Sequence, residues 1–212
     1  FYECGFNSLY SYISEDMNTE LPEGYLPGGG RNDDVVLVFS KIARNSSYGD
    51  VPSYLRRLYK DAEGNVISDT LKTYPSSTIA SSGATMKEVL NPVKTTFPAK
   101  GYGMIYASHG SGWLPEGYYN NPSDFEKKHR QSSADGRKLS ASSRILSIPE
   151  GNMETDDPYA SMVRSIGQDK TSSRDVEMDL TEFSEGIPFK LDYLLFDMCF
   201  SGGIEVAYAL KD

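Results

Sequence analysis

Four short, almost uninterrupted apolar runs constrain the fold of this chain more than any other feature. They span residues 1–4, 34–39, 102–107 and 191–196. A strand that is apolar along its whole length has both of its faces covered, which is typical of the central strands of a parallel sheet. The sequence therefore predicts a mostly parallel sheet with helices packed on both sides.

Segments with helical spacing or helix start signals lie between these runs. The expected helices span residues 7–17, 52–59, 84–96, 179–186 and 204–210. Pro92 is expected to kink the helix at 84–96, because proline lacks the N–H that an inner helical turn needs. Strands that alternate with helices indicate an open α/β sheet in one domain.

A long polar stretch from Leu114 to Val176 interrupts this pattern. Connections of this length are usually functional or disordered. We expect a single domain over residues 1–212 with a long insert at 114–176. The chain begins at Phe1 without a methionine and stops at Asp212 near the end of a helix, so we treat it as part of a longer protein, truncated at both ends.

The charge balance and the hydropathy pattern exclude some partners. Thirty acidic residues against 21 basic ones give a formal net charge of -9. This charge repels phosphate backbones, which argues against nucleic acid, and it attracts basic peptides. No apolar run approaches the roughly 20 residues that cross a bilayer, so no membrane span is expected in this fragment.

The two cysteines, Cys4 and Cys199, form neither a disulfide framework nor a CxxC zinc pair. Cys4 is expected to be a buried thiol at a strand end. Several carboxylates suit a hard cation but lack the spacing of an EF-hand, so no metal site is expected. These residues are Asp156, Asp157, Asp169 and Asp175.

His109 and Cys199 are the residues best placed for chemistry. Each lies just beyond the carboxyl end of an expected strand, at 102–107 and 191–196. Ligands of open α/β sheets bind at this edge. If the two strands are neighbours, an imidazole faces a thiol across one crevice, as a cysteine nucleophile requires.

Gly110 and Asp197 complete the candidate site. The backbone amides of Gly110 and Cys199 are the natural pair of donors for an oxyanion. A carboxylate beside a thiol raises the pKa of the thiol, so Asp197 is not expected to activate Cys199. Two interpretations of Asp197 stay open: it pairs with an Arg or Lys side chain of a substrate, or it ties down a neighbouring loop.

Two blocks of sequence resemble the signature blocks of the clostripain-like cysteine peptidases. These are Ser-His-Gly-Ser-Gly-Trp at 108–113 and Phe-Asp-Met-Cys-Phe at 196–200. The stretches at 4–9, 164–169 and 179–187 support the resemblance, which covers nearly the whole chain. The family belongs to the clan of caspases, gingipains and legumains, so the resemblance implies a caspase-like three-layer sandwich.

The resemblance implies an endopeptidase that cleaves after Arg or Lys, with His109 and Cys199 as a catalytic dyad. It also implies an oxyanion hole made by the amides of Gly110 and Cys199, and a basic-residue pocket that contains Asp197. Such chemistry requires no cofactor, and the resemblance alone leaves calcium open. Members are commonly exported precursors that cut themselves between the two blocks. A secreted or cell-envelope location is therefore expected, with a processing site within the 114–176 insert.

The resemblance also implies parts that this fragment lacks, and one residue departs from it. In relatives, the segment after Asp212 adds strands and pocket walls, so this missing C-terminal segment is an expected partner alongside peptide substrates. The usual small residue between the aspartate and the cysteine is Met198 here, which is expected to narrow the pocket or alter its preference.

Two other classes compete with the peptidase hypothesis. A serine hydrolase of the α/β-hydrolase class is disfavoured because no Gly-x-Ser-x-Gly elbow occurs in the sequence. A catalytically silent caspase-like module that binds peptides or partners in the same crevice remains the alternative.

Overall fold

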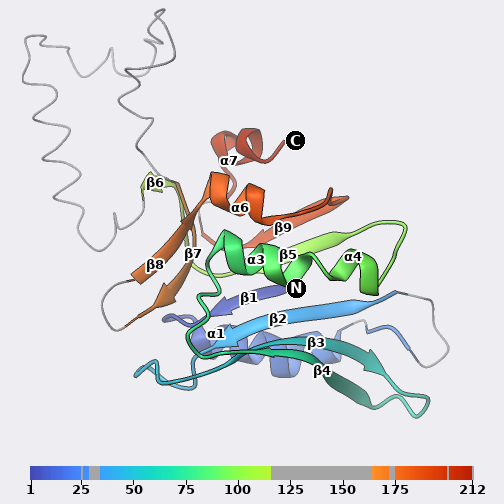
Figure 1. Ribbon diagram of the computed structural model, residues 1–212. Coiled ribbons are helices and arrows are strands. Elements are labelled where there is room, and N and C mark those ends of the chain that lie inside the picture. Colours follow the sequence, from blue (N-terminus) through green and yellow to red (C-terminus); the bar gives the residue numbers. More distant parts are fainter. Residues whose placement is uncertain (25, 29–33, 116–163, 172–174, 200, 212) are drawn as a thin grey trace, which may run out of the picture.

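The computed structural model describes residues 1–24, 26–28, 34–115, 164–171, 175–199 and 201–211 (Figure 1). Its main sheet has six strands in the order β4-β3-β2-β1-β5-β9. Their bounds are β1 Tyr2–Gly5, β2 Val36–Ile42, β3 Ser53–Lys60, β4 Val66–Tyr74, β5 Gly103–Ala107 and β9 Tyr193–Asp197. Strands β2, β1, β5 and β9 run parallel, whereas β3 and β4 are antiparallel at one edge. The prediction of a mostly parallel α/β sheet is confirmed.

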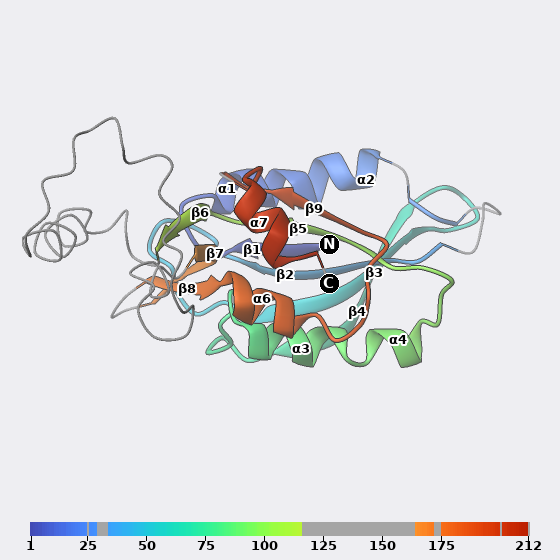
Figure 2. The same cartoon turned by 90° about the horizontal axis from the view of Figure 1, so that it is seen from above.

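Helices cover both faces of this sheet, as Figure 2 shows from above. One face carries α1 (Tyr10–Glu15), the π-helical η1 (Asp16–Glu20) and α2 (Leu21–Glu23). The other face carries α3 (Gly83–Leu90), α4 (Val93–Thr96) and α6 (Leu180–Gly186), and α7 (Ile204–Ala209) follows β9. The segment expected to be one helix at 84–96 is divided into α3, which ends at Leu90, and α4, which begins at Val93 directly after Pro92, where a kink was expected.

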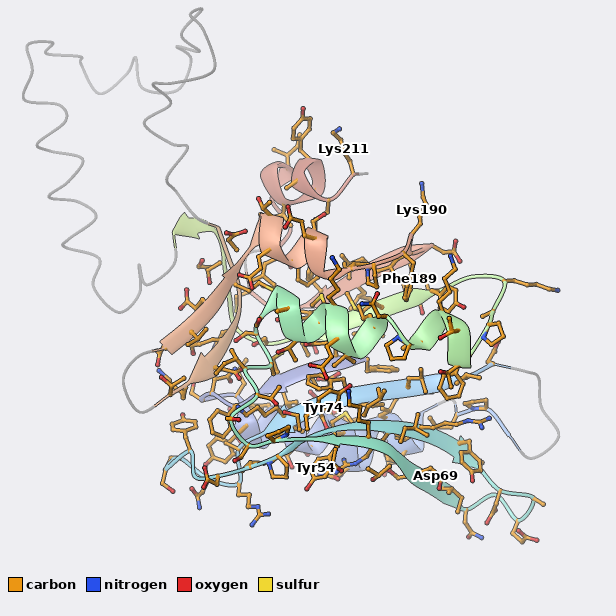
Figure 3. All side chains as sticks on the ribbon, in the orientation of Figure 1. Tyr54, Asp69, Tyr74, Phe189, Lys190 and Lys211 are labelled. Carbon is orange, nitrogen blue, oxygen red and sulfur yellow. The ribbon has the colours of Figure 1, made fainter. Side chains whose placement is uncertain are left out.

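Aromatic side chains in contact with one another fill much of the main core, on the face of the sheet that α3 and α6 cover. The ring of Tyr2 lies 4.6 Å from Phe39 and 5.5 Å from Tyr106, measured between ring centroids. Tyr106 meets Phe183 of α6 edge to face at 5.1 Å. Tyr74, labelled in Figure 3, closes the other side against Phe39. Phe39 of β2, Tyr2 of β1 and Tyr106 of β5 thus form a row of contacting rings. This row stabilises the order of these three parallel strands.

A second sheet of three antiparallel strands lies at the carboxyl ends of the parallel strands (Figure 1). It consists of β6 (Gly110–Pro115), β7 (Arg164–Lys170) and β8 (Asp175–Asp179) in sequence order. The interpretation of 114–176 as one loop is therefore wrong at its end, where residues 164–170 form a strand. Both strands consist mostly of polar residues, with Ile166 in β7 and Met178 in β8 as buried apolar side chains, so they lack a continuous apolar signal.

The predicted helix at 52–59 is wrong, because the segment forms β3. Leu55 and Leu58 are both buried, and their spacing of three residues imitates a helical face. A register shift between Leu55 and Arg56 changes the phase of the strand at that point. A β-bulge of this kind places buried residues three apart in an extended chain.

Candidate active site

Strands β5 and β9 are neighbours, and this brings His109 and Cys199 to the same rim. Ala107, the last residue of β5, pairs with Asp197, the last residue of β9. The backbone N–H of Ser108 donates to the carbonyl of Asp197 at 3.4 Å, one residue beyond the paired ends. His109 and Cys199 each follow two residues after this pair, in the loops that leave adjoining parallel strands.

Gly110 shows how closely the two loops approach. A Cβ atom at this position would lie 1.8 Å from Cε of Met198 and 3.0 Å from the carbonyl oxygen of Cys199. Only glycine leaves that space free, so the histidine loop packs directly on the cysteine turn. Met198 is half-buried and also packs against the main core, so its side chain supports the turn from beneath Gly110.

The His109 side chain is half-buried, and its environment favours the neutral ring. Burial lowers the pKa of His109, and the nearby charge of Lys170 lowers it further, while Glu177 and Asp175 oppose this change. A neutral imidazole has a lone pair that accepts a proton, which is the state that a general base requires. The ring Nε2 lies 2.7 Å from the hydroxyl oxygen of Ser8.

The histidine loop is held by β7, a contact that the sequence interpretation missed. The N–H of Gly167 donates to the carbonyl of His109 at 2.9 Å. Gly167 has a φ of 77°, and a Cβ atom there would lie 2.2 Å from the hydroxyl oxygen of Tyr106. The Arg-Ser-Ile-Gly-Gln-Asp stretch that supported the family resemblance therefore forms the strand that fixes this loop.

Cys199 is an exposed free thiol, whereas Cys4 is fully buried in the main core. Strand β9 ends at Asp197 and Cys199 lies in the turn that follows, so strand geometry does not set the side of the sheet on which its sulfur lies. Burial raises the pKa of the Cys4 thiol, and the charge of Asp169 raises it further. The expectation that Cys4 is a structural thiol is confirmed.

The Asp197 side chain is exposed and lies near other carboxylates. Glu3 pairs with Ala107, which pairs with Asp197, so Glu3 and Asp197 lie in one row across three strands. Burial raises the pKa of Glu3 from 4.5 to about 7, and the charges of Asp16 and Asp197 add to this shift. Asp197 therefore contributes to a negative potential on the side of the sheet that α1 and η1 cover.

The raised pKa of Glu3 predicts a change of stability with pH. The folded chain holds this proton up to about pH 7 and the unfolded chain only to about pH 4.5, so the resulting stability is complete below pH 4.5 and lost as the pH rises to 7. We expect Glu3→Gln to exceed the wild type in free energy of unfolding by roughly 3 kcal/mol at pH 8, and by much less at pH 5. Urea denaturation at both pH values measures this difference, with the exposed Glu63→Gln as control. Equal pH dependence of Glu3→Gln and wild type would contradict it.

The aspartates considered for a cation have other partners or lie outside the described residues. Asp169 is fully buried, accepts a hydrogen bond from the N–H of Ala80 at 2.8 Å and lies 3.4 Å from the ammonium of Lys41. Asp175 forms an ion pair with Lys170. Asp156 and Asp157 fall in the range that the structure does not describe. Among the residues that it does describe, no group of three or more His, Cys, Asp or Glu side chains is arranged to hold a metal ion.

A histidine and a cysteine follow adjoining ends of parallel strands, on a sheet with helices on both faces, which is the arrangement that the resemblance to the clostripain-like cysteine peptidases implies. The sequence model of the Clostripain family, named Peptidase_C11, matches residues 1–125, more than half of the chain. The chain belongs to this family, which confirms the resemblance found in the sequence.

Solved structures of C11 proteases have the same fold. A secreted C11 cysteine protease from Bacteroides thetaiotaomicron, in complex with an irreversible peptide inhibitor, is 28% identical with a TM-score of 0.65. An inactive zymogen C11 protease from Parabacteroides distasonis is 20% identical with a TM-score of 0.62. Both matches cover 99% of this chain and 44% of the relative, so the chain spans less than half the length of these proteins. No curated protein sequence matches it.

None of the helices in the described part of the chain is long and apolar enough to cross a membrane.

Proposed function

We propose that the complete protein is a cysteine endopeptidase that cleaves after Arg or Lys through a dyad of Cys199 and His109. One observation carries the proposal: the paired ends of β5 and β9, at Ala107 and Asp197, each lead within two residues to one member of the dyad. The close approach of Gly110 to the backbone of Cys199 supports it.

In the proposed reaction, His109 takes the proton of the Cys199 thiol and the thiolate attacks the scissile carbonyl carbon. The carbonyl oxygen becomes an oxyanion that the amides of Gly110 and Cys199 stabilise. The protonated imidazole then gives its proton to the leaving amine, and water hydrolyses the acyl-enzyme. The lowered pKa of His109 suits this sequence, because the resting ring is ready to accept a proton.

Asp197 is proposed to bind the cationic side chain that precedes the scissile bond. Its carboxylate is exposed, and no hydrogen bond or ion pair to another described residue ties it to a loop. The net charge of -9 and the neighbouring carboxylate of Asp16 favour a cation at this edge.

Fluorogenic peptides that end in Arg, Lys or Asp test this function on the complete protein. We expect turnover of the Arg or Lys peptides and none of the Asp peptide. A thiol alkylator should abolish the turnover, because it removes the nucleophile. Turnover that resists alkylation would contradict the cysteine mechanism, and absence of turnover under activating conditions would favour the binding module.

Self-cleavage and export are part of the same proposal. The relatives include a zymogen and a secreted protease. Nine Lys and Arg residues between Leu114 and Val176 offer processing sites: Lys127, Lys128, Arg130, Arg137, Lys138, Arg144, Arg164, Lys170 and Arg174. Arg164 and Lys170 lie within β7, where pairing in the sheet protects the backbone, so cleavage is not expected at these two positions.

Intact mass spectrometry of the complete protein measures this processing. The wild type is expected to give two fragments whose masses place the cut after one of these basic residues. Cys199→Ala is expected to remain a single chain. Equal cleavage of both proteins would assign the cut to another protease.

A further inference from the structure

The side chain of Ser8 contacts the imidazole ring of His109, a contact that the sequence pattern does not predict. Its Oγ lies 2.7 Å from Nε2 of His109, across 101 residues of chain. We propose that Ser8 is a positioning residue. Its hydroxyl oxygen accepts a hydrogen bond from Nε2–H of His109 and so holds the ring, which leaves the lone pair of Nδ1 to exchange a proton with Cys199. This inference rests on the proposed cysteine peptidase function.

Ser8 is held in place by its buried neighbour Asn7. The Asn7 amide nitrogen donates to the carbonyls of Cys4 and Gln168, both at 2.8 Å, and its amide oxygen accepts from the N–H of Leu9 at 2.9 Å. Asn7 is fully buried. The backbone on both sides of Ser8 is therefore fixed, although the Ser8 side chain itself is exposed.

His109 is held in the same way by its own buried neighbour, Ser108. The Ser108 hydroxyl donates to the carbonyl of Cys4 at 3.0 Å and accepts from the N–H of Gln168 at 3.2 Å. Asn7 also donates to this hydroxyl at 3.3 Å. Since Asn7 and Ser108 share the carbonyl of Cys4, the two loops are joined directly beneath the contact between Ser8 and His109. An exposed hydrogen bond is thus supported by a buried network, which limits the freedom of both partners.

The chemistry gives this bond a defined role. A neutral imidazole carries one N–H and one lone pair, and the partner of one nitrogen decides which nitrogen holds the proton. With Nε2–H donating to Ser8, the lone pair lies on Nδ1. In the reaction, the Cys199 proton moves from sulfur to Nδ1 and later from Nδ1 to the leaving amine, while Nε2–H stays bonded to Ser8. The bond becomes charge-assisted when the ring is protonated, so it strengthens as the thiolate forms.

Kinetics of the complete protein with an Arg fluorogenic peptide provide the first test. We expect Ser8→Ala to lower kcat about ten- to a hundredfold with little change of KM, the range of a lost hydrogen bond to a charged group. Ser8→Thr, which keeps the hydroxyl, should restore most of the rate. Ser68→Ala, on an exposed part of β4, is the matched control and should behave as the wild type. Equal kcat of Ser8→Ala and wild type would overturn the proposal and leave the peptidase function intact.

NMR of the imidazole nitrogens provides a second test that does not depend on activity. The chain has two histidines, so a His129→Gln background leaves His109 as the single signal. With Ser8 present, we expect His109 to be in the Nε2–H form alone. After Ser8→Ala, we expect a mixture of both tautomers and a lower pKa of His109. An unchanged tautomer and pKa would overturn the proposal even if the protein were inactive. An inactive wild type with the expected NMR change would instead refute the peptidase function and retain the contact.

Discussion

Replacing Cys199 by alanine is expected to lower kcat/KM for Arg and Lys peptides at least about a thousandfold, the scale of losing a catalytic nucleophile. The chain has two cysteines, and Cys4 cannot replace the missing sulfur. Cys4 is fully buried, and its Sγ lies 3.6 Å from the hydroxyl of Tyr106. A residual rate near that of the wild type would therefore exclude a cysteine mechanism in this domain.

The matched control for this experiment is Cys4→Ala. It removes the other thiol, so it is expected to lower the free energy of unfolding through lost core packing and to leave kcat/KM unchanged under conditions where the protein is folded. The same pair of variants separates the two thiols in alkylation, since only the exposed Cys199 is expected to react with iodoacetamide in the folded state. Loss of activity in Cys4→Ala, with folding retained, would contradict the assignment of the nucleophile.

Replacing Asp197 by asparagine is expected to cause the second largest effect. Loss of one charge from a desolvated ion pair typically costs about 2–5 kcal/mol, which corresponds to a decrease of roughly 30- to 5,000-fold in kcat/KM for Arg and Lys peptides. Peptides with a neutral residue at the same position should be affected little, because they make no ion pair. The preference for basic residues should therefore collapse. Kinetics on matched Arg and Gln peptides measure this preference directly.

Asp192→Asn is the control for Asp197. Asp192 is an exposed aspartate that directly precedes β9, at the end of the strand far from the dyad. Its substitution therefore removes one negative charge, as Asp197→Asn does, but away from the candidate site. It should leave the ratio of Arg to Gln cleavage unchanged. An equal decrease in both variants would show that net charge, and not a pocket at Asp197, sets the preference.

The sequence predicted the parallel part of the fold, because its strands are buried on both faces. The runs at 1–4, 34–39, 102–107 and 191–196 correspond to β1, β2, β5 and β9 within two or three residues at each end. The other strands escaped prediction for physical reasons. Strands β7 and β8 bury only part of their residues, and β4 is exposed along most of its length, so none of the three shows a continuous apolar pattern.

The parts of the candidate site that depend on strand ends can be inferred from the sequence, whereas the parts that depend on polar contacts cannot. His109 and Cys199 follow directly from the two strands, although only the structure shows that β5 and β9 are neighbours. Ser8 and Asn7 carry no such signal, because serine and asparagine are common in any loop. Their sole indication was the Cys-Gly-Phe-Asn-Ser-Leu stretch of the family resemblance. A strand that continued to Cys199 would place its side chain on the same side of the sheet as that of Asp197, but β9 ends at Asp197, so this arrangement does not follow from the strand.

Covalent labelling tests the central claim, the pairing of His109 with Cys199, most directly. The complete protein is treated with a peptidyl-Arg acyloxymethyl ketone and the adduct is located by peptide mapping in wild type, His109→Ala and Ser8→Ala. We predict a single adduct on Cys199 of the wild type, formed much more slowly in His109→Ala. An adduct on Ser8 or Cys4, or labelling of Cys199 at the same rate without His109, would contradict the account.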